Sequence, residues 1–174
     1  MSKQTQQQMM MDEQKIITVL QTRGLEDIDL LAKHCGFSKQ KVRRILHKLE
    51  EEQKIWGYAP VLDTDKLNMK HYLILIKKTN KPLEQLADII ISRDIEKKTK
   101  ELGIIIQTSQ YLHGDYDWQL SIAAGNIKFA KKFCEILVTL YGEYIGDLVL
   151  LEALFAVKQF GLTNPRIKKI KEYL

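Results

Sequence analysis

The stretch FSKQKVRRILHKLEEEQKIWGY, residues 37–58, separates its charges into blocks. Five cations and no acid lie between Ser38 and Lys48, and three glutamates follow at 50–52. Serine is a residue type that often begins helices. Apolar residues then recur at the spacing of a one-sided helix, at Val42, Ile45, Leu46 and Leu49. The pattern predicts a helix that buries one face and presents cations on the other.

Two shorter patterns before this stretch predict a helix-turn-helix. A helix is expected from Asp12 to a stop at Gly24, and a second over residues 26–36. Ala32, Gly36 and Val42 then stand at relative positions 0, +4 and +10. This spacing supplies a small residue where two helices touch, a glycine for the turn and a branched residue that locks the next helix.

The segment after the basic helix, KIWGYAPVLD, favours a strand or a small wing. Pro60 keeps such a strand at a sheet edge. Trp56 and Tyr58 are expected to cover the core of this small domain.

The cationic face of the third helix predicts contact with double-stranded DNA. At 100° per residue, Gln40 and Arg44 lie opposite the apolar stripe, so they are expected to reach base edges. Lys39, Arg43 and Lys48 are expected to contact phosphates. The full predicted set is Ser38, Lys39, Gln40, Arg43, Arg44, His47 and Lys48. The alternative is a solvated face of an ordinary amphipathic helix.

Residues 71–160 show the order strand, helix, strand, strand, helix, strand, which is that of a ferredoxin-like βαββαβ domain. The first helix is expected to follow Pro82, with an inward stripe at Leu83, Leu86, Ala87 and Ile90 and a break at 92–94. Asn126 is expected to cap the second helix. Helices then cover one sheet face, and the apolar residues on the other face predict a homodimer.

These two segments resemble the Lrp/AsnC, or feast/famine, regulators. The residues that carry the first resemblance are Ala32, Gly36, Ser38, Val42, Arg44, Ile45, Leu49, Glu50, Ile55, Gly57, Tyr58, Asp63 and Leu67. Gln53 departs from that family's pattern, in which a glycine is usual. The second half resembles the family's RAM effector-binding domain and has its G-x-Y-D turn at 114–117.

The resemblance implies an α+β protein with a winged helix-turn-helix domain followed by a RAM domain. It also implies sequence-specific transcriptional regulation, assembly beyond the dimer into higher even-numbered oligomers, and an amino-acid effector. The candidate effector residues are Gly114, Asp115, Tyr116 and Asp117. A turn that uses Gly114 for its geometry and Asp117 to fix the hairpin is the alternative.

The sequence predicts five parts for the chain. These are a disordered tail (1–11), the DNA-binding domain (12–62), a linker (63–70), the RAM-like domain (71–160) and a C-terminal helix (161–174). The last helix is expected to begin near Pro165, with its stripe at Ile167, Ile170 and Leu174.

The overall charge of +5 does not itself predict DNA binding, because residues 1–65 carry ten cations and ten acids. The two cysteines, Cys35 and Cys134, lie far apart in sequence and favour a reducing, cytoplasmic location. No membrane span, metal site or cofactor motif is expected.

Two other functions stay open on the sequence. Sirohaem decarboxylases share this architecture, although residues 116–122 read YDWQLSI rather than the stretch associated with them. The other alternative is an effector-binding or interaction protein without DNA binding, which the balanced charge of residues 1–65 allows.

Overall fold

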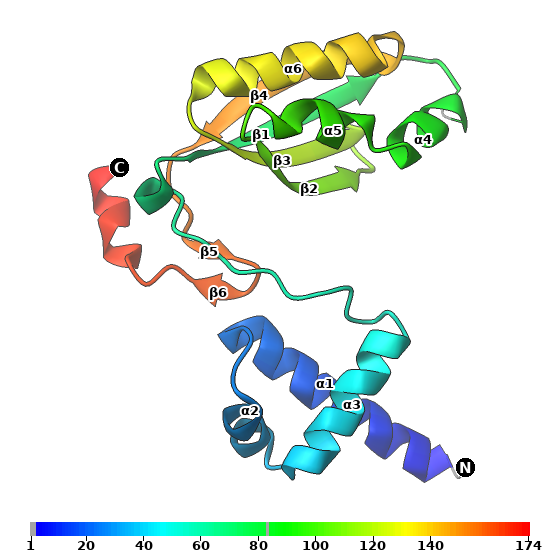
Figure 1. Ribbon diagram of the computed structural model, residues 1–174, viewed down its shortest axis with the longest axis vertical. Coiled ribbons are helices and arrows are strands. Elements are labelled where there is room, and N and C mark those ends of the chain that lie inside the picture. The colour runs from blue at the N-terminus through cyan, green and yellow to red at the C-terminus, as the bar shows by residue number, and fades with distance from the viewer. Residues whose placement is uncertain (1–2, 83) are drawn as a thin grey trace. The chain divides into compact units, whose positions relative to one another are not determined.

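The first 62 residues form three helices around one small core in the computed structural model, which describes residues 3–82 and 84–174. They are α1 (Lys3–Arg23), α2 (Ile28–Cys35) and α3 (Lys39–Glu51) (Figure 1). The apolar stripes meet in a cluster of fully or nearly fully buried side chains: Ile16, Leu31, Ala32, Cys35, Val42, Ile45 and Leu49. The predicted inward face of α3 is therefore confirmed. Leu31 and Ala32, which the sequence also predicts to face inward from α2, are buried in the same cluster.

Helix α1 begins well before Asp12, where the sequence predicts a start. Residues 3–11 of the predicted disordered tail are helical, and residues 1–2 lie outside the described residues. Gln, Met and Lys have good helix propensity, and this segment contains neither glycine nor proline. Once the packed half of α1 is formed, adding such residues to its N-terminal end costs little, because nucleation has already occurred.

The segment after α3 does not form the predicted wing strand. Residues 54–62 carry no regular structure, and Trp56 is 96% exposed rather than part of the core. A strand needs a neighbour for its backbone groups, and no described strand pairs with this segment. Tyr58 is held instead by its hydroxyl, which donates to Glu50 Oε1 at 2.8 Å.

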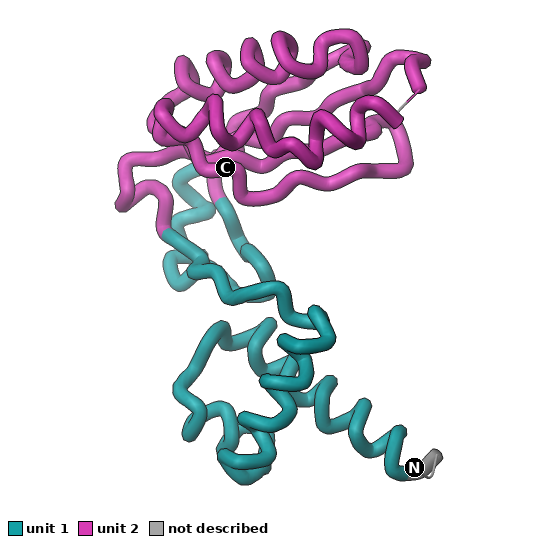
Figure 2. Tube along the Cα trace, turned by 45° about the vertical axis from the view of Figure 1, so that its right-hand side comes forward, with its two compact units in different colours: residues 1–62, 156–174 teal, residues 63–155 magenta. Residues whose placement is uncertain are grey.

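Residues 63–155 form the second compact unit, which begins where the predicted linker begins (Figure 2). Its strands are β1 (Lys70–Lys78), β2 (Ile105–Tyr111), β3 (Trp118–Ala124) and β4 (Ile145–Ala153). They form an antiparallel sheet in the order β2-β3-β1-β4. This is the predicted ferredoxin-like arrangement, and it is confirmed.

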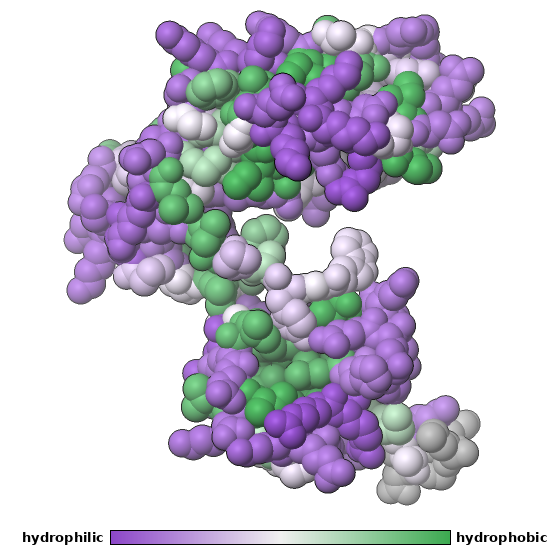
Figure 3. All heavy atoms as spheres, in the orientation of Figure 1, coloured by the Kyte–Doolittle hydropathy of each residue, from purple (hydrophilic) through white to green (hydrophobic). Residues whose placement is uncertain are grey.

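Three helices lie on one side of this sheet: α4 (Glu84–Ile91), α5 (Asp94–Lys100) and α6 (Ile127–Tyr141) (Figure 1). Two short 3-10 helices, η1 (Asp65–Leu67) and η2 (Gly142–Tyr144), precede β1 and β4. Hydrophilic residues dominate the outer surface of the helices, with hydrophobic residues visible between them (Figure 3). The alternate residues Tyr72, Ile74 and Ile76 of β1 point into the core beneath the helices.

The predicted helix boundaries of this unit are mostly confirmed. Asn126 caps α6, since its Oδ1 accepts from the amides of Lys128 and Phe129 at 2.9 and 3.3 Å. The predicted break lies between α4 and α5, where Arg93 has a left-handed backbone with φ 56°. Leu83, predicted in the inward stripe, lies outside the described residues.

Three predictions for this unit differ from the structure. Ala87, predicted in the inward stripe of α4, is exposed, and Leu86 is the residue of that helix that is buried. The sequence predicts an apolar stripe at Phe129, Phe133, Leu137 and Leu140, but Phe129 is 39% exposed. The buried residues of α6 are Ala130, Phe133, Leu137 and Tyr141. The last strand is expected over residues 149–160, but β4 ends at Ala153.

The residues after 155 belong with the three helices and not with the sheet (Figure 2). They form a hairpin of β5 (Lys158–Gln159) and β6 (Leu162–Thr163), followed by a 3-10 helix, η3 (Ile167–Glu172). The predicted C-terminal helix over 161–174 is therefore shortened, because its first residues pair in the hairpin. No helix in the described part of the chain is long and apolar enough to cross a membrane.

Candidate nucleic-acid interface

The turn between α2 and α3 fixes the direction in which α3 leaves the core. Gly36 has φ 64° and ends α2, and the amide of Phe37 donates to Ala32 O at 2.9 Å. Ser38 then caps α3, since its Oγ accepts from the amide of Lys41 at 3.2 Å. Ala32 and Val42, the other two residues of the predicted spacing, lie in the core. The predicted turn at Gly36 and the predicted cap at Ser38 are therefore confirmed.

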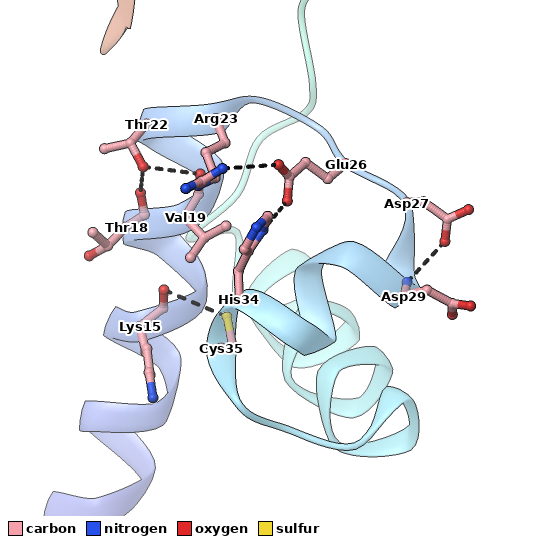
Figure 4. Close-up of polar contacts among 10 residues, drawn as sticks. All are labelled: Lys15, Thr18, Val19, Thr22, Arg23, Glu26, Asp27, Asp29, His34 and Cys35. Carbon is pink, nitrogen blue, oxygen red and sulfur yellow. Dashed lines mark hydrogen bonds and ion pairs between the residues drawn. The ribbon is translucent and has the colours of Figure 1, made fainter.

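A set of polar contacts links the end of α1, the segment that follows it and both ends of α2 (Figure 4). Asp27 caps α2 through the amide of Asp29, at 2.9 Å. Glu26 lies 2.7 Å from His34 Nδ1 and 4.0 Å from Arg23. These contacts join the end of α1, residues 26–27 and α2. They therefore help to fix the position of α2, against which α3 packs.

Six of the seven side chains predicted to meet DNA are exposed. They are Ser38, Lys39, Gln40, Arg43, Arg44 and His47. Arg43 and Arg44 have no ion-pair partner in residues 3–82 and 84–174. Both guanidinium groups are therefore available to a ligand without first breaking an internal pair.

Lys39 and His47 have acidic partners at the surface. Lys39 Nζ lies 2.6 Å from Asp29 Oδ2, and each of these side chains is 57% exposed. His47 Nε2 lies 3.2 Å from Glu51 Oε1, one helical turn further on. Such exposed pairs contribute little to stability, so these side chains can exchange partners at low cost.

Lys48 lies at the junction of α3 with α1. Its Nζ donates to Glu13 Oε1 at 2.6 Å, and Lys54 Nζ donates to Glu13 Oε2 at 2.8 Å. The hydrogen bonds from Lys48 and then Lys54 hold the pKa of the Glu13 carboxyl below its usual value, against the opposing effect of burial. Of the predicted set, Lys48 is thus the half-buried member that also has a structural role.

Glu13 is not among the residues predicted from the sequence, although a signal for it is present. Glu13 falls on the same helical face as Ile16, Ile17 and Leu20, and it is only 7% exposed. A carboxylate on an apolar stripe requires a cationic partner. The inward-facing acid therefore points to a lysine on the packed neighbour.

The G-x-Y-D turn connects β2 and β3. Asp117 is fixed at three atoms: its Oδ2 accepts from Lys78 N at 2.9 Å, its amide donates to Ile76 O at 2.9 Å, and its carbonyl accepts from Leu112 N at 2.8 Å. Gly114 and Asp115 are exposed, and Lys77 Nζ lies 5.3 Å from the centre of the Tyr116 ring. Asp117 therefore holds the hairpin, and Asp115 is the carboxylate of this turn that faces solvent.

Three of the four histidines have separate polar partners. His34 contacts Glu26, His47 contacts Glu51, and His71 Nδ1 lies 2.9 Å from Gln107 Oε1. Within the described ranges, no group of three or more His, Cys, Asp or Glu side chains is placed to hold a metal ion.

No protein-family model and no curated protein sequence matches this chain. Solved structures do match. An AsnC family transcriptional regulator from Agrobacterium tumefaciens has 22% identity and a TM-score of 0.61, over 85% of this chain and 92% of that one. A transcriptional regulator from Neisseria meningitidis in complex with L-methionine has 19% identity and a TM-score of 0.61, over 85% and 91%.

A feast or famine regulatory protein from Mycobacterium tuberculosis, complexed with L-methionine, has 12% identity and a TM-score of 0.64, over 85% of this chain and 93% of that one. The architecture is thus that of a two-domain protein with a helix-turn-helix and a ferredoxin-like sheet. More particularly, the chain has the fold of the Lrp/AsnC regulators, and the resemblance seen in the sequence is confirmed for the fold.

Proposed function

We propose that the chain is a sequence-specific, DNA-binding transcriptional regulator of the Lrp/AsnC type. The observation that carries this proposal is the outer face of α3, where Arg43 and Arg44 are exposed and have no ion-pair partner among the described residues. The core packing of Val42, Ile45 and Leu49 on the opposite side holds this face outward. A helix presented in this way fits the major groove of duplex DNA.

Within this interface, Gln40 and Arg44 are assigned to base edges, and Lys39 and Arg43 to phosphates. Ser38 both caps α3 and can donate its hydroxyl hydrogen to a phosphate. His47 lies one turn beyond Arg43, and its pair with Glu51 must open for it to contact DNA. Lys48 is bonded to Glu13, so it must change partner to contact a phosphate.

The functional form is proposed to be a homodimer that buries the open face of the sheet. Leu73 pairs in register with Leu151, and Leu75 with Val149, so their side chains share the face opposite the helices. Leu151 is 45% exposed. A contiguous apolar patch of this kind favours self-association, and a two-fold dimer reads half-sites about one helical turn apart or a multiple of it.

An amino-acid effector is proposed for the turn at Gly114–Asp117. The Asp115 carboxylate faces solvent and can pair with an ammonium group, and the exposed backbone at Gly114 can meet a carboxylate. Two structures with this fold contain L-methionine, which makes that amino acid the first to test.

A reducing cytoplasm is the location proposed for the chain, because it suits the two free thiols, Cys35 and Cys134.

The test is a DNA-binding measurement with the full chain. Duplexes selected from a random-sequence pool are titrated by fluorescence anisotropy over a salt series, with and without L-methionine. The logarithm of the binding constant is expected to fall linearly with the logarithm of salt concentration, by about 0.9 per phosphate neutralised. Absence of salt-dependent binding, or recovery of the chain with a bound tetrapyrrole, contradicts the proposal.

A further inference from the structure

The C-terminal segment, residues 156–174, is held on the three-helix unit by a close backbone contact. Gly161, with φ 87°, occupies the turn between β5 and β6. A Cβ atom at this position would lie 2.0 Å from Gln21 O of α1, so only glycine allows the two backbones to approach. Leu162 packs beside Gly24, just past the end of α1.

Asn164 fixes the path of the chain from this hairpin into η3. Its side-chain Nδ2 donates to Ala156 O at 2.8 Å, and its amide donates to Val157 O at 3.0 Å. Its Oδ1 accepts from the amide of Arg166 at 2.8 Å. The segment is therefore a packed part of the first unit.

The outer side of η3 is strongly cationic. Lys168, Lys169 and Lys171 are all exposed, and none has an ion-pair partner in the part of the chain that the structure describes. Residues 156–174 carry five cations and one acid, a net charge of +4. We name Lys168, Lys169 and Lys171 the C-terminal lysine group.

The division of the chain into units changes how its charge is distributed. Residues 1–62 carry ten cations and eight acids, so with the C-terminal segment the first unit has a net charge of +6. Residues 63–155 carry twelve cations and thirteen acids, a net charge of −1. The unit that presents α3 therefore holds the entire positive excess, and most of it comes from the C-terminal segment.

We propose that the C-terminal lysine group is a second DNA-phosphate contact of the three-helix unit, separate from the face of α3. This inference rests on the proposed function. The partner is duplex DNA, because the unit that presents α3 to DNA also carries the lysine group. The phosphate backbone of that DNA continues beyond the bases that α3 reads. Flexible lysines suit this role, since a phosphate contact needs charge and no fixed geometry.

The experiment uses the full chain with K168Q, K169Q and K171Q combined, titrated with a selected duplex over a salt series. We expect weaker binding at low salt. The slope of the logarithm of the binding constant against the logarithm of salt concentration should become shallower by about 0.9 for each phosphate that the variant no longer neutralises. The ranking of DNA sequences stays the same, because phosphate contacts do not distinguish bases.

The matched control combines K128Q, K131Q and K132Q on α6, three exposed lysines of the other unit. It removes the same charge, so an equal weakening of binding in both triple variants assigns the effect to overall charge and overturns the inference. Thermal unfolding of each variant shows that the fold is kept.

Other outcomes separate this inference from the function on which it rests. An unchanged salt dependence in the C-terminal variant overturns the inference alone, provided that the wild-type chain binds DNA. Failure of the wild-type chain to bind DNA contradicts the proposed function. If the C-terminal variant loses binding to phosphatidylserine vesicles while its DNA binding is unchanged, the lysine group belongs to a membrane-binding surface. That result overturns the proposed DNA contact.

Discussion

Lys48 of α3 donates a hydrogen bond of 2.6 Å to Glu13 of α1, whose side chain is only 9% exposed. Lys54 donates to the other carboxylate oxygen, so both oxygens of this nearly buried acid are satisfied. Glu52 lies within 3.7 Å of Lys48 and 2.7 Å of Lys54 and completes the cluster. The basic helix is thus joined to α1 by charge as well as by apolar packing.

Glu13→Gln is expected to destabilise the protein by about 1–2 kcal/mol. The amide removes the anion that Lys48 and Lys54 share, but Glu52 stays within reach of both and the two lysines can regain water, which limits the destabilisation. Urea denaturation measures the change in the free energy of unfolding. The control is Glu51→Gln, in an exposed pair with His47, for which less than about 0.5 kcal/mol is expected.

The contribution of Glu13 also depends on pH. Its folded-state pKa is lowered by Lys48 and then Lys54, so the stabilisation is fully present above the unfolded-state pKa. It is lost as the pH falls through the lowered folded-state value. The difference in stability between wild type and Glu13→Gln should therefore shrink in acid, and a difference that grows there contradicts this assignment.

Gln53→Gly is expected to stabilise the protein by about 0.5–1 kcal/mol. Gln53 has φ 54° and follows the C-terminal end of α3, where its amide donates to Glu50 O at 3.0 Å and that of Lys54 donates to Leu49 O at 2.9 Å. This is the position at which helices favour glycine, because a Cβ atom disfavours the left-handed backbone.

Gln53→Ala is the control for this change, since alanine keeps the Cβ atom and should bring no such gain. Thermal unfolding of both variants measures the difference. Equal stability of the glycine and alanine variants would show that the backbone at this position is not strained. The left-handed backbone at position 53 thus gives a conformational reason for the glycine that is usual at this place in the family pattern. The sequence alone does not show this reason.

Local signals in the sequence predict the parts of the fold that local interactions determine. Ser38 and Asn126 cap helices as expected, and Gly36 ends α2. These features depend on residues a few positions apart. Their hydrogen bonds and spacing are therefore visible in a linear pattern.

The missed features depend on partners that are distant in sequence. The segment around Trp56 has strand-forming residues but no neighbouring strand among the described residues, so propensity alone fails there. The contact of Gly161 with Gln21 joins the two ends of the chain. No periodicity within residues 156–174 indicates where they dock, and so the charge of the first unit could not be assigned from the sequence.

Arg43 and Arg44 of α3 should differ in what they contact on DNA. Arg44→Ala is expected to cost about 1–3 kcal/mol on a selected DNA site and to relax the sequence preference, because the variant no longer reads a base edge. Arg43→Ala should weaken binding to all sequences alike. It should also make the slope of the logarithm of the binding constant against the logarithm of salt concentration shallower by about 0.9. Repeating the random-sequence selection with each variant measures the preference. A uniform weakening in Arg44→Ala would reverse the assignment of the two arginines.

Leu151→Asp is expected to disrupt the proposed dimer. Leu151 is 45% exposed on β4 and lies beside Leu73 on the sheet face opposite the helices. An aspartate there places a charge in an apolar contact that occurs twice about a two-fold axis, so both copies of the interface are weakened. Size-exclusion chromatography with light scattering should show a shift from twice the chain mass to the 20.3 kDa of one chain.

Val138→Asp is the matched control for the dimer, because Val138 is 50% exposed on α6, on the helical side of the sheet. This variant should keep the mass of the dimer. A wild-type chain that elutes as a monomer, or a Leu151→Asp variant that stays dimeric, contradicts the sheet-mediated interface. Loss of the dimer should also weaken binding to a duplex with two half-sites more than to a single half-site, since the two α3 helices are then no longer linked.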